Sequence, residues 1–89
     1  MSIYRKKIDA IQPELVDHAR KLGASVEMLH RVGSGVPDLL LGFEGKNYLV
    51  EVKSEKGKLN KLQVKWHTDW KGQKCVIRTK KEIERLLGL

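Results

Sequence analysis

Two carboxylates and a lysine stand within a mostly apolar stretch of this 89-residue chain: Asp38 in "GVPD", and Glu51 and Lys53 in "VEVK". Two carboxylates can share one Mg²⁺ ion, which takes one or two such ligands and keeps several waters. A water held in this way is a potential nucleophile, and the cation stabilises charge that develops on a phosphate. Lys53 could position that water or neutralise the transition state. The residue types therefore indicate metal-assisted phosphodiester hydrolysis.

We expect a β-hairpin to bring these side chains together, with strands over residues 36–43 and 47–54 around the turn "EGK". Folding this hairpin places Asp38 roughly opposite Glu51 or Val52, and directly paired residues have Cβ atoms about 5 Å apart. A register shift of one residue would put the two carboxylates on opposite faces. The proposed site therefore depends on the hairpin register.

The same pattern has a simpler explanation. Side chains alternate along a strand, so Glu51 and Lys53 share one face while Val50 and Val52 take the other. Antiparallel sheets often keep one polar face, and the two charges could simply be solvated there. Spacing alone leaves both interpretations open.

The rest of the chain predicts helices packed on a sheet. Apolar residues at helical spacing predict a first helix that ends at Gly23, which Pro13 either starts or kinks. Capping boxes at "NKLQ" and "TKKE" mark two more helix starts. In chain order we expect a helix up to residue 22, a strand over 24–32, the hairpin, a helix over 59–70, a strand over 74–78 and a helix over 79–89. The order αβββαβα predicts one α/β domain over residues 1–89, with a mixed sheet flanked by helices.

Composition favours a globular protein with a polyanionic partner. Charged residues make up 33% of the chain and the net charge is +7, which favours nucleic acid ahead of an anionic membrane, although solubility alone would also explain it. The single cysteine, Cys75, cannot form an internal disulfide. No run has the length of a membrane span or the character of a secretory signal. We therefore expect an intracellular protein that does not interact with membranes.

Longer sequence motifs around the hairpin give a more specific signal than the three charged residues alone. "GVPD", a spacer, "VEVK" and then "LNKLQ" resemble the VRR-NUC family, the virus-type replication-repair nuclease domain of the PD-(D/E)xK nuclease superfamily. The resemblance covers nearly the whole chain, and it implies a restriction-endonuclease-like αβββαβ core. It also implies a stand-alone domain of the phage or bacterial type, in the cytoplasm of a bacterium or a phage-infected host cell.

The resemblance assigns roles to five residues. It implies that Asp38 and Glu51 are metal ligands together with the backbone carbonyl of Val52, that Lys53 is the catalytic lysine, and that Gln63 reaches the active site from the following helix. The capping box explains Gln63 without catalysis, and both roles can hold together. Mg²⁺ or Mn²⁺ is the expected cofactor.

One position departs from the family pattern. The first helix of family members usually contributes a glutamate to the metal site, and here that position falls on Gln12, with Glu14 two residues later. Gln12 lies beside the apolar stripe of the predicted helix, whereas Glu14 points further from it. We include Gln12 as a supporting residue, and this departure implies weaker binding of a second metal or a site closed through a water.

The predicted activity is that of a metal-dependent DNA endonuclease, similar to a homodimeric Holliday-junction resolvase that cuts branched DNA. The alternative is a catalytically inactive DNA-binding module of the same fold, and a toxin or restriction-type nuclease would share the chemistry. Trp66 and Trp70, one helical turn apart, are more typical of a core or an interface than of a base-stacking surface. A basic rim for DNA is expected from Lys56, Lys58, Lys61 and Lys65.

Overall fold

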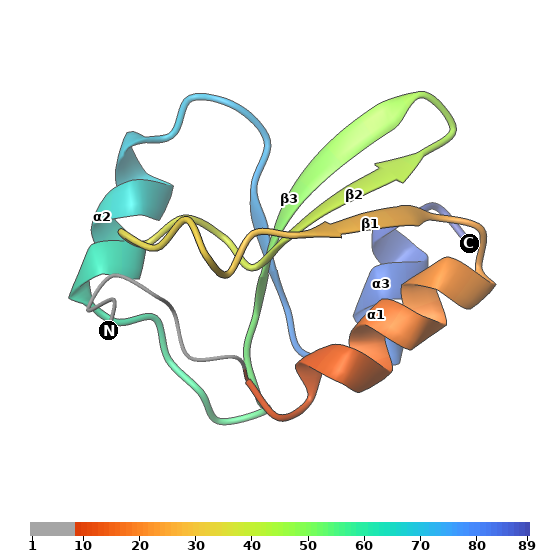
Figure 1. Ribbon diagram of the computed structural model, residues 1–89, viewed down its shortest axis with the longest axis horizontal. Coiled ribbons are helices and arrows are strands. Elements are labelled where there is room, and N and C mark those ends of the chain that lie inside the picture. Colours follow the sequence, from red (N-terminus) through yellow and green to blue (C-terminus); the bar gives the residue numbers. More distant parts are fainter. Residues whose placement is uncertain (1–8) are drawn as a thin grey trace.

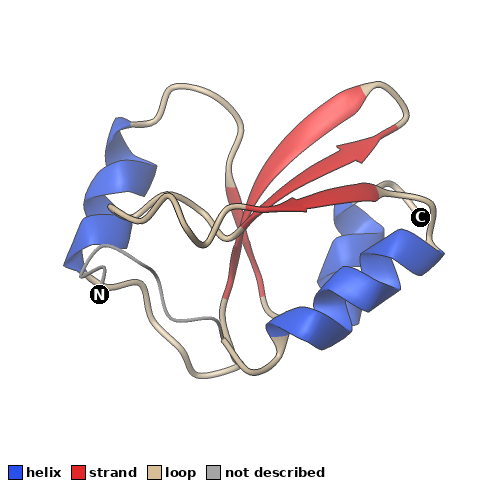
Figure 2. Ribbon diagram, in the orientation of Figure 1, coloured by secondary structure: helices blue, strands red, loops and turns tan. Residues whose placement is uncertain are grey.

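The predicted element order is confirmed by a computed structural model that describes residues 9–89 (Figures 1 and 2). The helices are α1 (Gln12–Lys21), α2 (Lys61–Asp69) and α3 (Lys80–Leu86), and the strands are β1 (Ser25–Met28), β2 (Leu39–Phe43), β3 (Lys46–Val52) and β4 (Cys75–Ile77). The strands form one mixed sheet in the order β1-β2-β3-β4. The β1–β2 and β2–β3 pairs are antiparallel, and β4 runs parallel to β3.

One face of the sheet carries the hydrophobic core. Leu39 pairs with Val50 and Val26 pairs with Leu41, so these side chains point to the same side. The core on this side consists of Leu15, Val16, Ala19, Ala24, Val26, Leu39, Leu41, Val50, Val52, Ile77, Ile83 and Leu87. Its helical members come from α1 and α3, which lie side by side in Figure 1.

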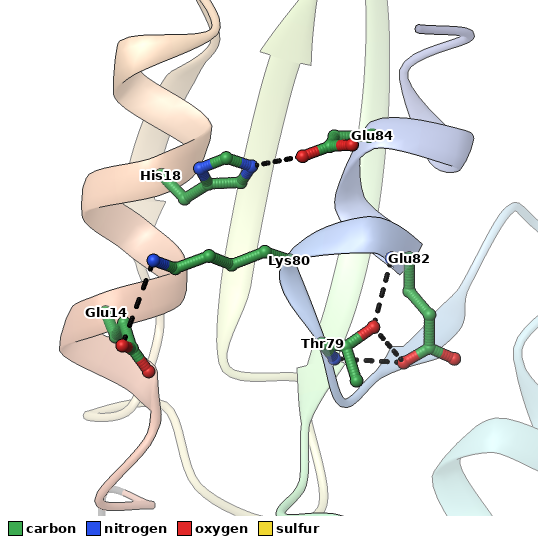
Figure 3. Close-up of polar contacts among 6 residues, drawn as sticks. All are labelled: Glu14, His18, Thr79, Lys80, Glu82 and Glu84. Carbon is green, nitrogen blue, oxygen red and sulfur yellow. Dashed lines mark hydrogen bonds and ion pairs between the residues drawn. The ribbon is translucent and has the colours of Figure 1, made fainter.

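Polar contacts at the surface also join α1 to α3 (Figure 3). His18 Nε2 lies 2.8 Å from a carboxylate oxygen of Glu84, and Lys80 Nζ lies 3.8 Å from a carboxylate oxygen of Glu14. Both pairs are partly or largely exposed, so they add little stability compared with the apolar contacts beneath them. The α1–α3 pair is therefore mainly a hydrophobic layer that supports the sheet.

Helix α2 stands apart from this layer, and the loop between β1 and β2 runs out to meet it (Figure 1). Gly35 in that loop lies so close to α2 that a Cβ atom there would overlap the carbonyl oxygen of Leu62. Gln63 is the only residue of α2 that is buried. The helix is therefore packed most deeply at Gln63 in its first turn, with Trp66 and His67 half-buried further along.

Local sequence signals set the helix starts as expected. Pro13 occupies the first turn of α1, so the regular helix begins there and is not kinked. Gly23 has a φ of +102° directly after α1. Both predicted capping boxes are formed, Asn60 with Gln63 and Thr79 with Glu82, the second of which is drawn in Figure 3. Residues 9–89 form no helix with the length and apolar character to cross a membrane.

The strands are shorter than predicted at the end that carries the acidic residues. β1 stops at Met28 instead of continuing to residue 32, because the chain turns over residues 29–32, where the N–H of Val32 donates to the carbonyl of Leu29. β2 begins at Leu39 rather than residue 36, two residues after Pro37, which has no N–H to donate to the sheet. Asp38 therefore lies just before a regular strand.

Candidate active site

Asp38 and Glu51 face each other at the end of the sheet where β2 begins and β3 ends. The last regular pair is Leu39 with Val50, so the next positions along the two strands are Asp38 and Glu51. Both side chains are buried, with 1% and 0% of their surface exposed. The predicted hairpin register is thus confirmed, and it places two carboxyl groups on the same face away from bulk water.

The Asp38 carboxylate is held by the backbone of the opposite strand. Its Oδ2 atom accepts a hydrogen bond of 2.6 Å from the N–H of Val52. The carbonyl of Asp38 also accepts a hydrogen bond from Leu29, which extends the β1–β2 pairing by one step. Asp38 therefore lies opposite Glu51 in register and contacts Val52 directly, which combines the two predicted positions.

The Glu51 carboxylate is held by a side chain from α2. Gln63 Nε2 donates to Glu51 Oε2 at 3.2 Å, and both residues are buried. Gln63 Oε1 accepts at the same time from the backbone N–H of Asn60 at 2.9 Å, which closes the capping box. The two predicted roles of Gln63, as a cap and as a neighbour of the acidic pair, thus occur together.

Lys53 follows β3 directly and is half-buried. Its backbone N–H donates to the carbonyl of Ile77 at 3.1 Å. Within the part of the chain that the structure describes, its ammonium group makes no hydrogen bond or ion pair, including with Asp38 or Glu51. The lysine is therefore positioned by its backbone at the end of β3, while its charged group remains available to a ligand.

Gln12 is buried at the start of α1, with 1% of its surface exposed, and neither polar atom of its amide has a hydrogen-bond partner among residues 9–89. Unpartnered buried amides are costly and rare. Glu14 instead lies at the surface beside Lys80 of α3. Of the two candidates in the first helix, the structure buries Gln12 and directs Glu14 away from the sheet.

The connection between α1 and β3 depends on Asp9, which the sequence analysis missed. Asp9 Oδ2 accepts from the N–H of Ser54 at 3.3 Å, while its Oδ1 accepts from the N–H of Ile11 at 3.1 Å. The backbone N–H of Gln12 also donates to the carbonyl of Asp9. An aspartate shortly before Pro13 is typical of a helix start, which was the available signal. These bonds hold the start of α1 beside the residue that follows Lys53.

The donors present suit a hard cation. Residues 9–89 contain no group of three or more His, Cys, Asp or Glu side chains that could hold a metal by themselves. Two buried carboxylates match Mg²⁺ or Mn²⁺, which accept few protein ligands and complete their shells with water, better than Zn²⁺. The buried Gln12 amide, which has no partner among residues 9–89, lines a pocket with Val16, Arg20 and Met28 that does not include the two carboxylates. The residues thus fit a divalent cation site.

Four lysines lie on α2 and on the loop that precedes it. The four predicted rim residues, Lys56, Lys58, Lys61 and Lys65, are all exposed. Lys65 Nζ lies 2.6 Å from Asp69 Oδ2, and this hydrogen bond raises the pKa of Lys65. The rim is therefore positively charged and accessible, with one of its lysines partly neutralised.

Comparison with known proteins adds two findings. Residues 5–78 match the family model described as the VRR-NUC domain. A solved structure titled "VRR_NUC domain" is similar to the chain with a TM-score of 0.70 and 27% identity, over 88% of this chain and 90% of that one. No curated protein matches the chain. The structural likeness confirms the predicted restriction-endonuclease-like fold.

Proposed function

The chain belongs to the VRR-NUC family, whose members are nucleases of the PD-(D/E)xK type, and we propose that it is a Mg²⁺- or Mn²⁺-dependent endodeoxyribonuclease. The observation that carries this proposal is the buried pair Asp38 and Glu51. One carboxylate is held by the N–H of Val52 and the other by the amide of Gln63. Such bonds pre-organise the two acidic groups, which favours binding of a cation over loose solvation.

In this proposal Asp38, Glu51 and the carbonyl of Val52 would hold the cation, which when bound would supply an activated water and charge stabilisation at the phosphate. Gln63 keeps Glu51 in place, because its other end is anchored in the helix cap. The Lys53 ammonium, which has no protein partner within residues 9–89, positions the attacking water or neutralises the negative charge that develops on the phosphate oxygens.

The preferred substrate is branched DNA such as a four-way junction, and the active form is a homodimer. Both follow from the resemblance to resolvases of the phage and bacterial type, as does an expected location in the bacterial or phage-infected cytoplasm. A domain of this size offers little surface to grip a branched duplex, whereas a two-fold pair presents two cleavage sites. The net charge of +7 supports DNA as the partner.

A catalytically inactive DNA-binding module is the second candidate. Its supporting observation is Gln12, a neutral residue at the position where family members usually have a glutamate. However, a protein that only binds DNA has no use for two buried carboxylates near a phosphate, because they repel it. The nuclease proposal explains the carboxylates, whereas the binding module explains only the glutamine.

The test incubates labelled four-way junction and matched linear duplex with the protein in Mg²⁺, Mn²⁺ or a chelator. Asp38→Asn keeps an oxygen for the N–H of Val52, and Lys53→Ala removes an ammonium that makes no hydrogen bond or ion pair within residues 9–89, so both variants should fold. Lys46→Ala, at the other end of β3, is the matched lysine control. We expect metal-dependent cleavage that is lost in the first two variants and retained in the third.

Other outcomes separate the candidates. Tight DNA binding without cleavage in either metal would favour the inactive module. Equal cutting of junction and duplex would retain the nuclease and remove the preference for branched DNA. Cleavage that survives Asp38→Asn would show that the acidic pair is not the catalytic site.

A further inference from the structure

A second feature, a group of large apolar side chains, lies on α2 and begins at Leu62, the residue before Gln63. Leu62 is 60% exposed and Trp70 is 42% exposed, although both are large and apolar. The rings of Trp66 and Trp70 stack with their centroids 4.9 Å apart and their planes 16° from parallel. These side chains line a pocket of about 300 Å³ together with Ser34, Lys65 and Asp69. Trp66 is half-buried and Trp70 is exposed, and neither belongs to the hydrophobic core.

The charge around this pocket favours one kind of occupant. Residues 55–74 contain six lysines, at positions 56, 58, 61, 65, 71 and 74, against only Glu55 and Asp69. A second copy of the chain would bring the same positive surface against it, and the like charges would repel. A nucleic-acid strand supplies the complementary charge through its phosphates, together with flat apolar rings that match the tryptophans.

The pocket is also rigidly connected to the candidate active site. Trp66 and Trp70 follow Gln63 by three and seven residues, or about 4.5 Å and 10 Å along the helix axis. From the other side, Ser34 belongs to the loop in which Gly35 contacts Leu62 and which leads directly to Asp38. Phosphates along one strand of duplex DNA are about 3.4 Å apart along the axis. A base in the pocket would therefore belong to a nucleotide near the phosphate at the carboxylates.

We propose that the pocket lined by Leu62, Trp66 and Trp70 receives an unstacked nucleobase of the DNA strand. This proposal rests on the proposed function and deepens it, because it names unpaired nucleotides as the feature that the enzyme recognises. The base stacks on the tryptophans, and Ser34, Lys65 and Asp69 offer a hydroxyl, an ammonium and a carboxylate to its polar edge. Stacking tolerates any sequence, since every base has a π-face. DNA with unpaired nucleotides is therefore bound better than closed duplex.

The test measures binding in a chelator, where no metal-dependent cleavage occurs. Fluorescence anisotropy gives Kd for a short labelled single strand, for a strand of equal length whose residues are abasic, and for a closed duplex hairpin. We expect the strand with bases to bind at least about ten-fold more tightly than the abasic strand. Removing one stacking ring costs a factor of roughly 5 to 150 in Kd, so Trp70→Ala should weaken the first complex by that factor and leave the abasic one unchanged.

Matched variants keep the result interpretable. Trp70→Phe retains an aromatic ring and should restore most of the affinity, and Leu62→Ala reduces the pocket wall without touching the tryptophan stack. Leu89→Ala removes an equally exposed apolar side chain at the end of the chain and should change nothing. Equal affinity for strands with and without bases would overturn the proposal.

A homodimer that covers the pocket is the competing outcome. Sedimentation velocity of the wild type and Trp70→Ala detects it, because a dimer that dissociates in the variant would make this face an interface between copies and overturn the proposal. A failure of the nuclease proposal can be distinguished from a failure of the pocket proposal. Base-dependent binding without cleavage in any metal leaves the pocket intact, whereas metal-dependent cleavage without base-dependent binding removes only the pocket.

Discussion

The side chain of Gln63 connects a helix cap to the acidic pair, since its Oε1 accepts from the N–H of Asn60 while its Nε2 donates to Glu51 Oε2. The start of α2 and the position of the Glu51 carboxylate therefore depend on one amide. Because Gln63 is the only buried residue of α2, the same amide is also the main point where the helix meets the sheet.

Replacing this amide by a carboxylate tests the connection. In Gln63→Glu the new oxygen can still accept from Asn60, but the other oxygen faces Glu51 and the two negative charges repel. One of the two carboxyl groups then has a raised pKa in the folded state. A raised pKa adds stability at low pH that is lost as the pH rises through the folded value. We expect the free energy of unfolding of Gln63→Glu to be roughly 1–3 kcal/mol lower than that of the wild type at about pH 8, and the difference to be much smaller at about pH 5.

Urea unfolding at the two pH values measures this difference. Asn60→Ala is the control, because it removes only the cap and should cost about 0.5–2 kcal/mol with little dependence on pH. If Gln63→Glu lost the same free energy of unfolding at both pH values, the result would contradict a contact between residue 63 and Glu51.

Binding of a divalent cation should stabilise the folded protein, because the site does not exist in the unfolded chain. At a free concentration of about 100 times Kd the gain is about 2.7 kcal/mol. Asp38→Asn should abolish this gain, since the amide is a weaker ligand and carries no charge. Thermal unfolding in a chelator and in rising Mn²⁺ or Mg²⁺ measures it without any DNA.

Glu14→Gln is the matched control for this experiment. It removes the same charge from an exposed side chain that pairs with Lys80 on α3. The stabilisation by metal should remain in this variant. Equal stabilisation of the wild type and Asp38→Asn would place the cation elsewhere.

Cys75 should react slowly with thiol reagents in the folded protein. Partial burial in β4 raises the pKa of its thiol, so less of the reactive thiolate is present at neutral pH. The thiol also lies 3.7 Å from the carbonyl of Leu49, within reach of a weak hydrogen bond. Because the folded pKa is raised, this group adds stability at neutral pH, and that stability is lost as the pH rises past the ordinary range of a thiol.

The rate of modification by a disulfide reagent at neutral pH, with and without urea, measures this protection. We expect the folded protein to react at least about ten times more slowly than the unfolded chain. Equal rates would show that β4 opens readily.

The features that sequence predicted well are local. The alternation of Val50, Glu51 and Val52 determines which side chains face the core, so the hairpin register followed from hydrophobicity alone. Asn60 and Thr79 act on residues three positions away, and both capping boxes were correct. The juxtaposition of Asp38 and Glu51 was predictable for the same reason, because it depends only on the register of one hairpin.

Features that depend on distant parts of the chain could not be predicted. The burial of Gln12 without a hydrogen-bond partner among residues 9–89 depends on how α1 packs on the sheet, and helical spacing indicates only that it could face inward. For Trp66 and Trp70 the sequence predicted a core or an interface, and the structure places neither residue in the hydrophobic core. Their helical spacing is the same whether a partner surface exists or not, and the structure leaves them lining an open pocket.

Gly35 should be essential for holding the Asp38 loop against α2, and Gly45 offers a matched comparison. Both have positive φ angles, +84° and +80°, so alanine at either position costs about 1–2 kcal/mol in backbone strain. At Gly45 a Cβ atom meets nothing within 4 Å, whereas at Gly35 it overlaps the backbone of Leu62, which cannot rotate away. We therefore expect Gly35→Ala to lose about 1–3 kcal/mol more than Gly45→Ala in urea unfolding.

The two variants should also differ in function. Moving the loop away from Leu62 separates Asp38 from the helix that supplies Gln63, so Gly35→Ala should lose metal-dependent cleavage under conditions where the variant is still folded. Gly45→Ala changes only the turn between β2 and β3, at the far end of the hairpin, and should cleave at the wild-type rate. Equal stability and activity in the two variants would show that the loop and α2 are not coupled through this contact.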